Sequence, residues 1–218
     1  MLLSLKKIFS KEKKLRAGFS LVELIMVVAI FIIITGVILS KQSKFSSDIL
    51  ITNVAYDIAL SIREAQVYGV GAKYDGASTI VYPYGVSFAL ATPKSFIFFV
   101  DNGPGIPNGQ YIVSDDTLIQ ENKLAQGQNI KKLCVYETPS WSCGLNKLNI
   151  SFIKPNPDPI FANENNPSSS TISEAVIIVE SALGDKCRAI RVNKVGQISV
   201  DPIKVDVDTC GTSYVDIF

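Results

Sequence analysis

Histidine is absent from all 218 residues of the chain. Histidine is the usual general base near neutral pH and the commonest metal ligand, so its absence removes the most frequent component of hydrolytic and zinc sites. No G-x-S-x-G, P-loop or dinucleotide-binding motif occurs either. We therefore expect no enzymatic activity and no cofactor.

Charge is almost missing from residues 19–39, where Glu23 is the only charged side chain. About twenty apolar residues are the length that a helix needs to cross a bilayer. A buried core helix of this length would normally keep a polar face. A lone carboxylate inside such a segment is costly, so we expect Glu23 to have a function.

The segment ahead of this run is strongly basic, with only Glu12 as an acidic residue against Lys6, Lys7, Lys11, Lys13, Lys14 and Arg16. The positive-inside rule places residues 1–18 in the cytoplasm. A secretory signal peptide would carry a small-residue cleavage site after its apolar core, and none follows Leu39. A permanent single-span anchor stays open as an alternative.

Proline is absent between Phe19 and Tyr82. Beyond Ser40 the apolar residues thin to one amphipathic stripe, formed by Leu50, Val54, Ile58, Ile62 and Ala65. The pattern predicts one helix from about Phe19 to about Val67, ended by Gly69 and Gly71.

The remaining residues alternate short β-like runs with turn signals, which predicts several antiparallel strands laid against the helix. The fold class is therefore α+β, with the long N-terminal helix packed on an antiparallel β-sheet domain. We expect Lys154–Ser173, rich in Pro, Asn and Ser, to be a surface excursion. The predicted strands are Thr79–Leu90, Ser95–Val100, Tyr111–Val113, Leu118–Leu124, Ile130–Glu137, Leu148–Lys154, Ala175–Glu180, Cys187–Asn193 and Gln197–Val200.

Four segments follow from these patterns. They are a cytoplasmic leader (1–18), a transmembrane or assembly helix (19–40), its amphipathic continuation (41–68) and a β-rich globular domain (69–218).

The stretch Arg16-Ala17-Gly18-Phe19-Ser20-Leu21-Val22-Glu23 resembles the processing site of type IV pilins and type II secretion pseudopilins. The resemblance implies cleavage between Gly18 and Phe19 by a prepilin peptidase, with methylation of the new amine at Phe19. It also implies that Glu23 pairs with the terminal amine of a neighbouring subunit, since buried charges cost less when paired. Glu23 snorkelling to the cytoplasmic interface is the alternative.

A second resemblance is to the GspH/FimT-like minor pilin branch. It rests on the strand and turn Phe98-Phe99-Val100-Asp101-Asn102-Gly103, and on the helical stretch Asp57–Ala65. Together the two resemblances imply a minor pilin or pseudopilin of a pilus or secretion-type filament.

The expected partners are other pilin or pseudopilin subunits, the prepilin peptidase and an inner-membrane assembly platform. The expected location is the bacterial inner membrane, single-pass, with a cytoplasmic N-terminus and the β-domain periplasmic or extracellular, before incorporation into a filament. Two alternatives remain: a tip pilin that binds DNA or a surface, and an uncleaved membrane-anchored periplasmic protein.

All four cysteines, Cys134, Cys143, Cys187 and Cys210, follow the apolar segment, so we expect them in an oxidising compartment. Closeness in sequence favours the disulfides Cys134–Cys143 and Cys187–Cys210 among the three possible sets. A zinc site is the alternative, although the chain has no C-x-x-C spacing.

The formal charge of +1 includes the leader. Without residues 1–18 the chain keeps fifteen basic and nineteen acidic residues, a net charge of −4, so a dominant nucleic-acid-binding surface is not expected. The local basic candidates for DNA are Arg188, Arg191 and Lys194. If they lie on one strand, Arg188 and Lys194 share a face and Arg191 takes the other.

Calcium binds to oxygen ligands, and the weak candidates for such a site are Asp101, Asn102, Asp115 and Asp116. The spacing of an EF-hand loop is absent, and Asp and Asn also dominate turns for conformational reasons. Asn149-Ile150-Ser151 is a formal glycosylation acceptor in an apolar, strand-like run, which argues against its use.

Overall fold

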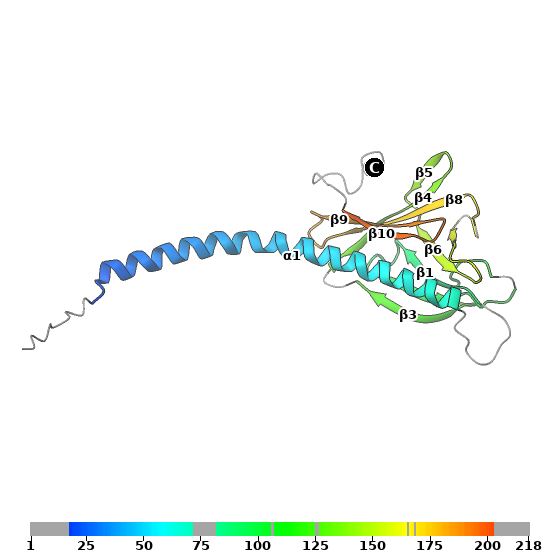
Figure 1. The fold of residues 1–218 in the computed structure, drawn as a ribbon, viewed down its shortest axis with the longest axis horizontal. Coiled ribbons are helices and arrows are strands. Elements are labelled where there is room, and N and C mark those ends of the chain that lie inside the picture. The colour runs from blue at the N-terminus through cyan, green and yellow to red at the C-terminus, as the bar shows by residue number, and fades with distance from the viewer. Residues whose placement is uncertain are drawn as a thin grey trace, which may run out of the picture. The chain divides into compact units, whose positions relative to one another are not determined.

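The computed structural model describes residues 18–71, 82–105, 107–124, 127–164, 166–167 and 169–202, with the backbone alone for 40–46 and 202. The chain divides into two compact units, Met1–Ser43 and Lys44–Phe218. The helix α1 (Leu21–Gly71) begins in the first unit and ends in the second (Figure 1). Its predicted continuity is confirmed, although it runs about one turn beyond Val67.

The second unit contains ten strands in two antiparallel sheets of five. One sheet has the order β3-β2-β1-β6-β7 and the other β10-β9-β8-β4-β5. The strands are β1 (Tyr84–Ala89), β2 (Ser95–Val100), β3 (Thr117–Lys123), β4 (Asn129–Glu137), β5 (Ser140–Cys143), β6 (Lys147–Phe152), β7 (Pro159–Asn163), β8 (Ile172–Glu180), β9 (Cys187–Asn193) and β10 (Ile198–Pro202).

The second half of α1 packs against both sheets in one hydrophobic core (Figure 1). Its buried residues recur every three or four positions, as the amphipathic pattern predicts, and are 0–4% exposed: Ile51, Val54, Ala55, Ile58, Ile62 and Ala65. Strands of both sheets contribute to the same core, for example Phe88 of β1 and Ile177 of β8. The α+β fold class, with the helix packed on antiparallel sheets, is confirmed.

The role of Gly69 differs from the prediction. The helix does not stop there but continues to Gly71. A Cβ at Gly69 would collide with the backbone carbonyl of Phe152 on β6, whereas one at Gly71 would meet nothing within 4 Å. Gly69 therefore allows close approach of helix and sheet, and it does not end the helix.

Two predictions for the β-rich domain are wrong, one of a strand and one of a surface excursion. Tyr111–Val113 is not a strand, because side chains satisfy the backbone of Tyr111: its N–H donates to Asn149 Oδ1 (3.4 Å) and its carbonyl accepts from Lys147 Nζ. The expected surface excursion Lys154–Ser173 contains β7, which pairs with β6. Phe161 of β7 is 1% exposed and anchors this segment in the core.

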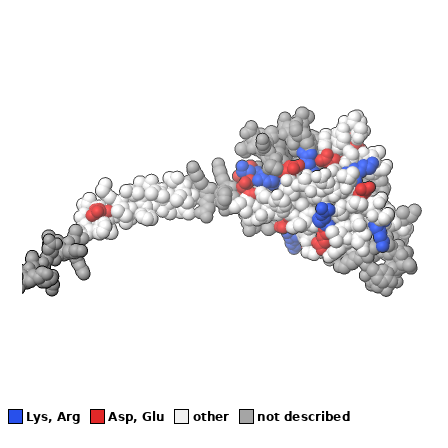
Figure 2. Space-filling view, viewed as in Figure 1, with Lys and Arg blue, Asp and Glu red and all other residues white. Residues whose placement is uncertain are grey.

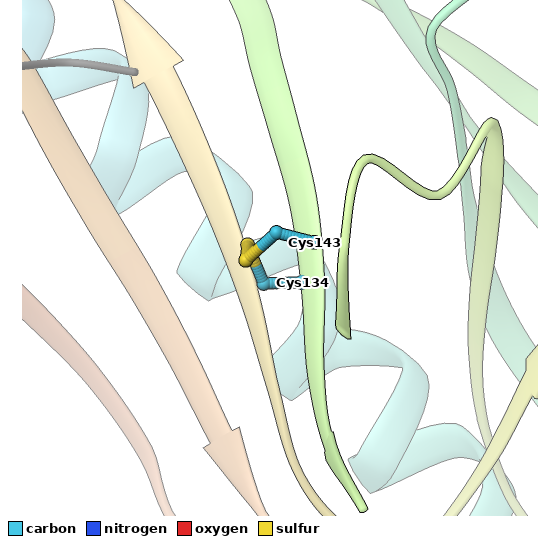
Figure 3. Close-up of a disulfide and its surroundings, with 2 residues drawn as sticks. All are labelled: Cys134 and Cys143. Carbon is cyan, nitrogen blue, oxygen red and sulfur yellow. A yellow bond between two sulfur atoms is a disulfide. The ribbon is translucent and has the colours of Figure 1, made fainter. Parts of the chain in front are cut away.

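The disulfide Cys134–Cys143 is present and joins residues directly opposite each other on β4 and β5 (Figure 3). This pairing confirms one of the two predicted disulfides. Cys187 is buried on β9. Cys210 lies outside the described residues, so its pairing with Cys187 stays a prediction.

Candidate functional site

The three residues predicted to govern processing and assembly lie just before α1 (Gly18 and Phe19) or in its first turn (Glu23). Gly18, Phe19 and Ser20 precede the helix and are exposed, with Phe19 77% exposed. No atom lies within 4 Å of where a Gly18 side chain would start. The peptide bond between Gly18 and Phe19 is therefore in non-helical backbone, free of contacts that would keep a peptidase away.

Ser20 caps the helix. Its Oγ accepts a hydrogen bond from the backbone N–H of Glu23 (3.2 Å), and its carbonyl accepts from Leu24 N–H (3.2 Å). The spacing Ser20-x-x-Glu23 is that of a capping box, in which the residue at the Glu23 position is Glu or Gln. This role of Ser20 was not predicted, although the Ser-x-x-Glu pattern indicates it.

Glu23 is exposed in the first turn of α1. A negative charge there interacts favourably with the positive end of the helix dipole. This local interaction explains why an acidic residue is favourable at the start of the helix. It does not offset the cost of placing a charge in a membrane-length apolar segment.

The stretch Leu21–Leu39 is the only one among the described residues that is long and apolar enough to cross a membrane. At 1.5 Å per residue it is about 28 Å long, close to the thickness of a bilayer core. None of its side chains is buried. The hydroxyl of Thr35 donates to the carbonyl of Phe31 (2.7 Å), so this polar group is satisfied inside the helix.

Figure 2 shows how differently charge is distributed in the two units. In Leu21–Leu39 only Glu23 is charged, whereas the visible face of the second unit carries intermixed basic and acidic side chains. One side of the apolar stretch also forms a shallow apolar hollow, lined by Val27, Val28, Phe31, Ile32, Thr35, Gly36 and Leu39.

The two arginines considered for DNA binding point to opposite faces of β9, as predicted. Arg188 lies toward α1, where it pairs with Asp48 (2.7 Å) and donates to Thr52 Oγ1 (3.1 Å). Arg191 pairs with Glu174 (3.2 Å) and Asp201 (2.6 Å). Both guanidinium groups are therefore neutralised within the fold.

Lys194 follows β9, and its Nζ lies 3.4 Å from the carbonyl of Ser170. The three basic candidates thus make contacts with three different parts of the fold.

The four weak calcium candidates lie in the loop after β2 and use their oxygens to bind the protein itself. Asp101 is 3% exposed and accepts from Gly109 N–H (2.6 Å). Burial raises the pKa of Asp101, opposed by this hydrogen bond. Asn102 Oδ1 accepts from Thr117 N–H (2.9 Å).

The other two candidates behave similarly. Asp116 accepts from the N–H groups of Gly103 (3.1 Å) and Ile112 (2.7 Å), and Asp115 accepts from Ser114 Oγ (2.7 Å). These bonds are those of turn-forming residues. Within the described ranges no group of three or more His, Cys, Asp or Glu side chains is placed to hold a metal ion.

Asn149, the formal glycosylation acceptor, is fully buried on β6. Its amide lies between Tyr111 N–H and the carbonyl of Ala162, each 3.4 Å away. It is therefore a structural residue of the core.

Comparison with protein-family models, with curated proteins and with solved structures found no match for this chain. The pilin-like architecture, one helix with an apolar first part and an amphipathic second part packed on antiparallel sheets, accordingly rests on the fold itself.

Proposed function

We propose that this chain is a minor pilin or pseudopilin, a non-enzymatic structural subunit that assembles into a filament through its N-terminal helix. The observation that carries the proposal is the start of α1. An exposed Gly18–Phe19 bond stands directly ahead of the capped helix α1, whose membrane-length first stretch, Leu21–Leu39, has Glu23 as its only charged residue.

In this function the subunit waits in the inner membrane with its N-terminus in the cytoplasm. A prepilin peptidase cuts after Gly18, and the amine of Phe19 is methylated. During assembly Glu23 pairs with the terminal amine of a neighbouring subunit and fixes the axial register, which apolar side chains alone would define poorly. An inner-membrane platform supplies the extraction step.

Two surfaces of α1 support assembly through helix contacts. The shallow hollow at Val27–Leu39 includes Gly36, where a small residue lets a second helix approach closely. Farther along, Ile49, Tyr56, Leu60 and Val67 are 45–65% exposed and lie on one line of the helix, opposite the buried stripe. Exposed apolar lines of this kind favour contact with other proteins.

The charge pattern favours assembly over DNA binding at a filament tip. Arg188 and Arg191 are held by Asp48, Glu174 and Asp201. A phosphate backbone would have to displace these carboxylates before it could gain the arginines.

The test is the intact mass of the protein purified from cells that contain a prepilin peptidase. We expect a chain that begins at Phe19 and carries one added methyl group. A chain that keeps residues 1–18 would instead support an uncleaved membrane-anchored protein. As a matched control, Gly18→Leu should keep the leader, because its side chain would enter a cleft that suits glycine.

A further inference from the structure

β3 is an edge strand that its own chain leaves open to solvent. It stands at the end of the sheet order β3-β2-β1-β6-β7, and among the described strands it pairs with β2 alone (Figure 1). Every residue of β3 except Asn122 is exposed. Even its two large apolar side chains are open to solvent, Leu118 at 50% and Ile119 at 44%. An open edge of this kind can pair with a strand of another chain.

The other three edge strands are each less suited to pairing. β7 begins with Pro159, and its free side already forms a bridge between Phe161 and Ser169. β10 ends at Pro202, and β5 has only four residues. Proline, an added segment and short length all protect sheet edges from pairing. β3 has seven residues and no proline.

The backbone of Glu121 and Lys123 points outward from the open edge. Leu124 N–H donates to the carbonyl of Lys94 (2.8 Å), so these two residues form a hydrogen-bonded pair of the ladder. Such pairs alternate with pairs that exchange no hydrogen bonds, so the next residue of β3 that bonds to β2 is Asn122. The N–H and C=O groups of Glu121 and Lys123 therefore face away from β2 and can bond to another strand.

A β-bulge limits the regular part of this edge. The register between β2 and β3 shifts between Phe98 and Phe99, which leaves Ile119 as the extra residue of β3. A bulge bends its strand and interrupts the ladder. The regular stretch is therefore Gln120–Leu124, and its centre is Asn122.

The charges of this stretch are complementary to those of a second copy. When two copies run antiparallel about Asn122, Glu121 of each copy is opposite Lys123 of the other. Opposite charges directly across a strand pair stabilise it, and like charges destabilise it. Pairing centred on Glu121 would set two glutamates against each other, so the charges also select the register.

We propose that two copies of this chain associate through β3, antiparallel and around a two-fold axis at Asn122. Glu121 and Lys123 form the hydrogen-bonded pairs of the new ladder, and the two Asn122 residues face each other in a pair without hydrogen bonds. The sheets β3-β2-β1-β6-β7 of the two copies then form one continuous sheet. This inference does not depend on the proposed function.

A cysteine at the axis tests the pairing in membranes of cells that contain the full-length chain, where strands of other proteins can compete. Asn122→Cys sets two Cα atoms about 4.5 Å apart, which a disulfide can span. The matched control is Gln120→Cys, on the same face of β3, whose Cα atoms in the two copies would be about 14 Å apart, beyond the reach of a disulfide.

After mild oxidation and purification, a non-reducing gel should show at least about fivefold more covalent homodimer for Asn122→Cys than for Gln120→Cys. Equal amounts in the two variants, or no homodimer in either, would overturn the proposal. Linkage of Asn122→Cys to a different protein in place of a second copy would also overturn it.

Charge reversal tests the register. In the Asn122→Cys background, Glu121→Lys sets lysine against lysine in both pairs and should lower the amount of homodimer about fivefold. Adding Lys123→Glu restores opposite charges and should return the homodimer to within about twofold of its original amount. Both positions are exposed, so these changes leave the core intact. Unchanged homodimer in the first variant, or no recovery in the second, would overturn pairing about Asn122.

Discussion

Gly69 of α1 lies so close to the carbonyl of Phe152 on β6 that a side chain at this position would overlap the strand backbone. Helix and sheet are thus in contact through main-chain atoms at the end of the helix. This contact fixes how near the amphipathic half of α1 can approach the sheet that contains β6.

We predict that Gly69→Ala destabilises the protein by about 1–3 kcal/mol, because the helix or the strand must move to admit the methyl group. Gly71→Ala is the matched control, since its methyl group would meet nothing within 4 Å. The measurement is urea unfolding of the detergent-solubilised chain, followed by the fluorescence of Trp141. Equal free energies of unfolding for the two variants would contradict the contact.

Much of this arrangement could be predicted from the sequence. The helix was found because its apolar residues keep a period near 3.6 without an interrupting proline. The role predicted for Gly69 was wrong, because a glycine that ends a helix and a glycine that lets a neighbouring backbone approach look the same in the sequence. Only the opposite strand distinguishes them.

The strand errors have a similar origin. β7 begins with Pro159 and lies in a segment rich in Pro and Asn. That composition predicts a loop, although the apolar residues Ile160 and Phe161 are typical of a strand. The split into two sheets was not predicted, because β1 pairs with β6 across 58 or more residues and no local pattern encodes that. In the candidate site, the processing and assembly roles of Gly18, Phe19 and Glu23 stay predictions, and the cap at Ser20 was not predicted.

A second prediction concerns the ion pair between Asp48 on α1 and Arg188 on β9. The Arg188 side chain is 13% exposed and that of Asp48 is 48% exposed. Arg188→Met should lower the free energy of unfolding by about 2 kcal/mol, because Asp48 and Thr52 both lose a charged donor. Lys194→Met, which removes an exposed side chain, should change it by less than about 0.5 kcal/mol.

A double-mutant cycle with Asp48→Asn and Arg188→Met isolates the pair. We expect a coupling energy of about 1 kcal/mol, because solvent at Asp48 screens the interaction. Strictly additive effects would mean that Arg188 acts through packing alone.

Asp185 predicts a pH dependence of stability. Hydrogen bonds from Ser181 Oγ (2.7 Å) and from Ser47 Oγ on α1 (3.1 Å) lower the pKa of Asp185, with Lys186 adding to the effect. A carboxyl group whose pKa is lower in the folded state than in the unfolded state stabilises the fold when the pH is above its unfolded-state pKa. It loses that contribution as the pH falls through its folded-state pKa.

Relative to Asp185→Asn, the wild-type chain should therefore be more stable by several tenths of a kcal/mol at neutral pH. The difference should fade as the pH drops below the ordinary value of 3.8. Unfolding of both chains across this pH range checks the sign. A difference that grows on acidification would contradict it.

The exposed apolar line on α1 leads to a prediction about assembly. Leu60 is 65% exposed, so Leu60→Glu should leave the free energy of unfolding within about 0.5 kcal/mol of wild type. It should nevertheless reduce incorporation into filaments, because a charge would be buried against the next subunit.

Leu183→Glu is the matched control for Leu60→Glu, since Leu183 is equally exposed (67%) but lies in the loop after β8. Incorporation is measured by quantifying each variant in sheared filaments against the amount left in the membrane. Equal loss in both variants would show that any added charge interferes, and that the line on α1 is not an interface.

The final prediction separates the two roles of Glu23. Glutamine also suits the third helical position of a capping box, so Glu23→Gln keeps the helix start and removes only the charge. We expect this variant to insert into the membrane and to be cleaved after Gly18, yet to be largely excluded from filaments, because the amine of the neighbouring subunit would be buried without a partner. Glu64→Gln, at an exposed position later in α1, should assemble normally. If Glu23→Gln enters filaments as well as Glu64→Gln does, the carboxylate serves the helix end alone and the register must come from apolar packing.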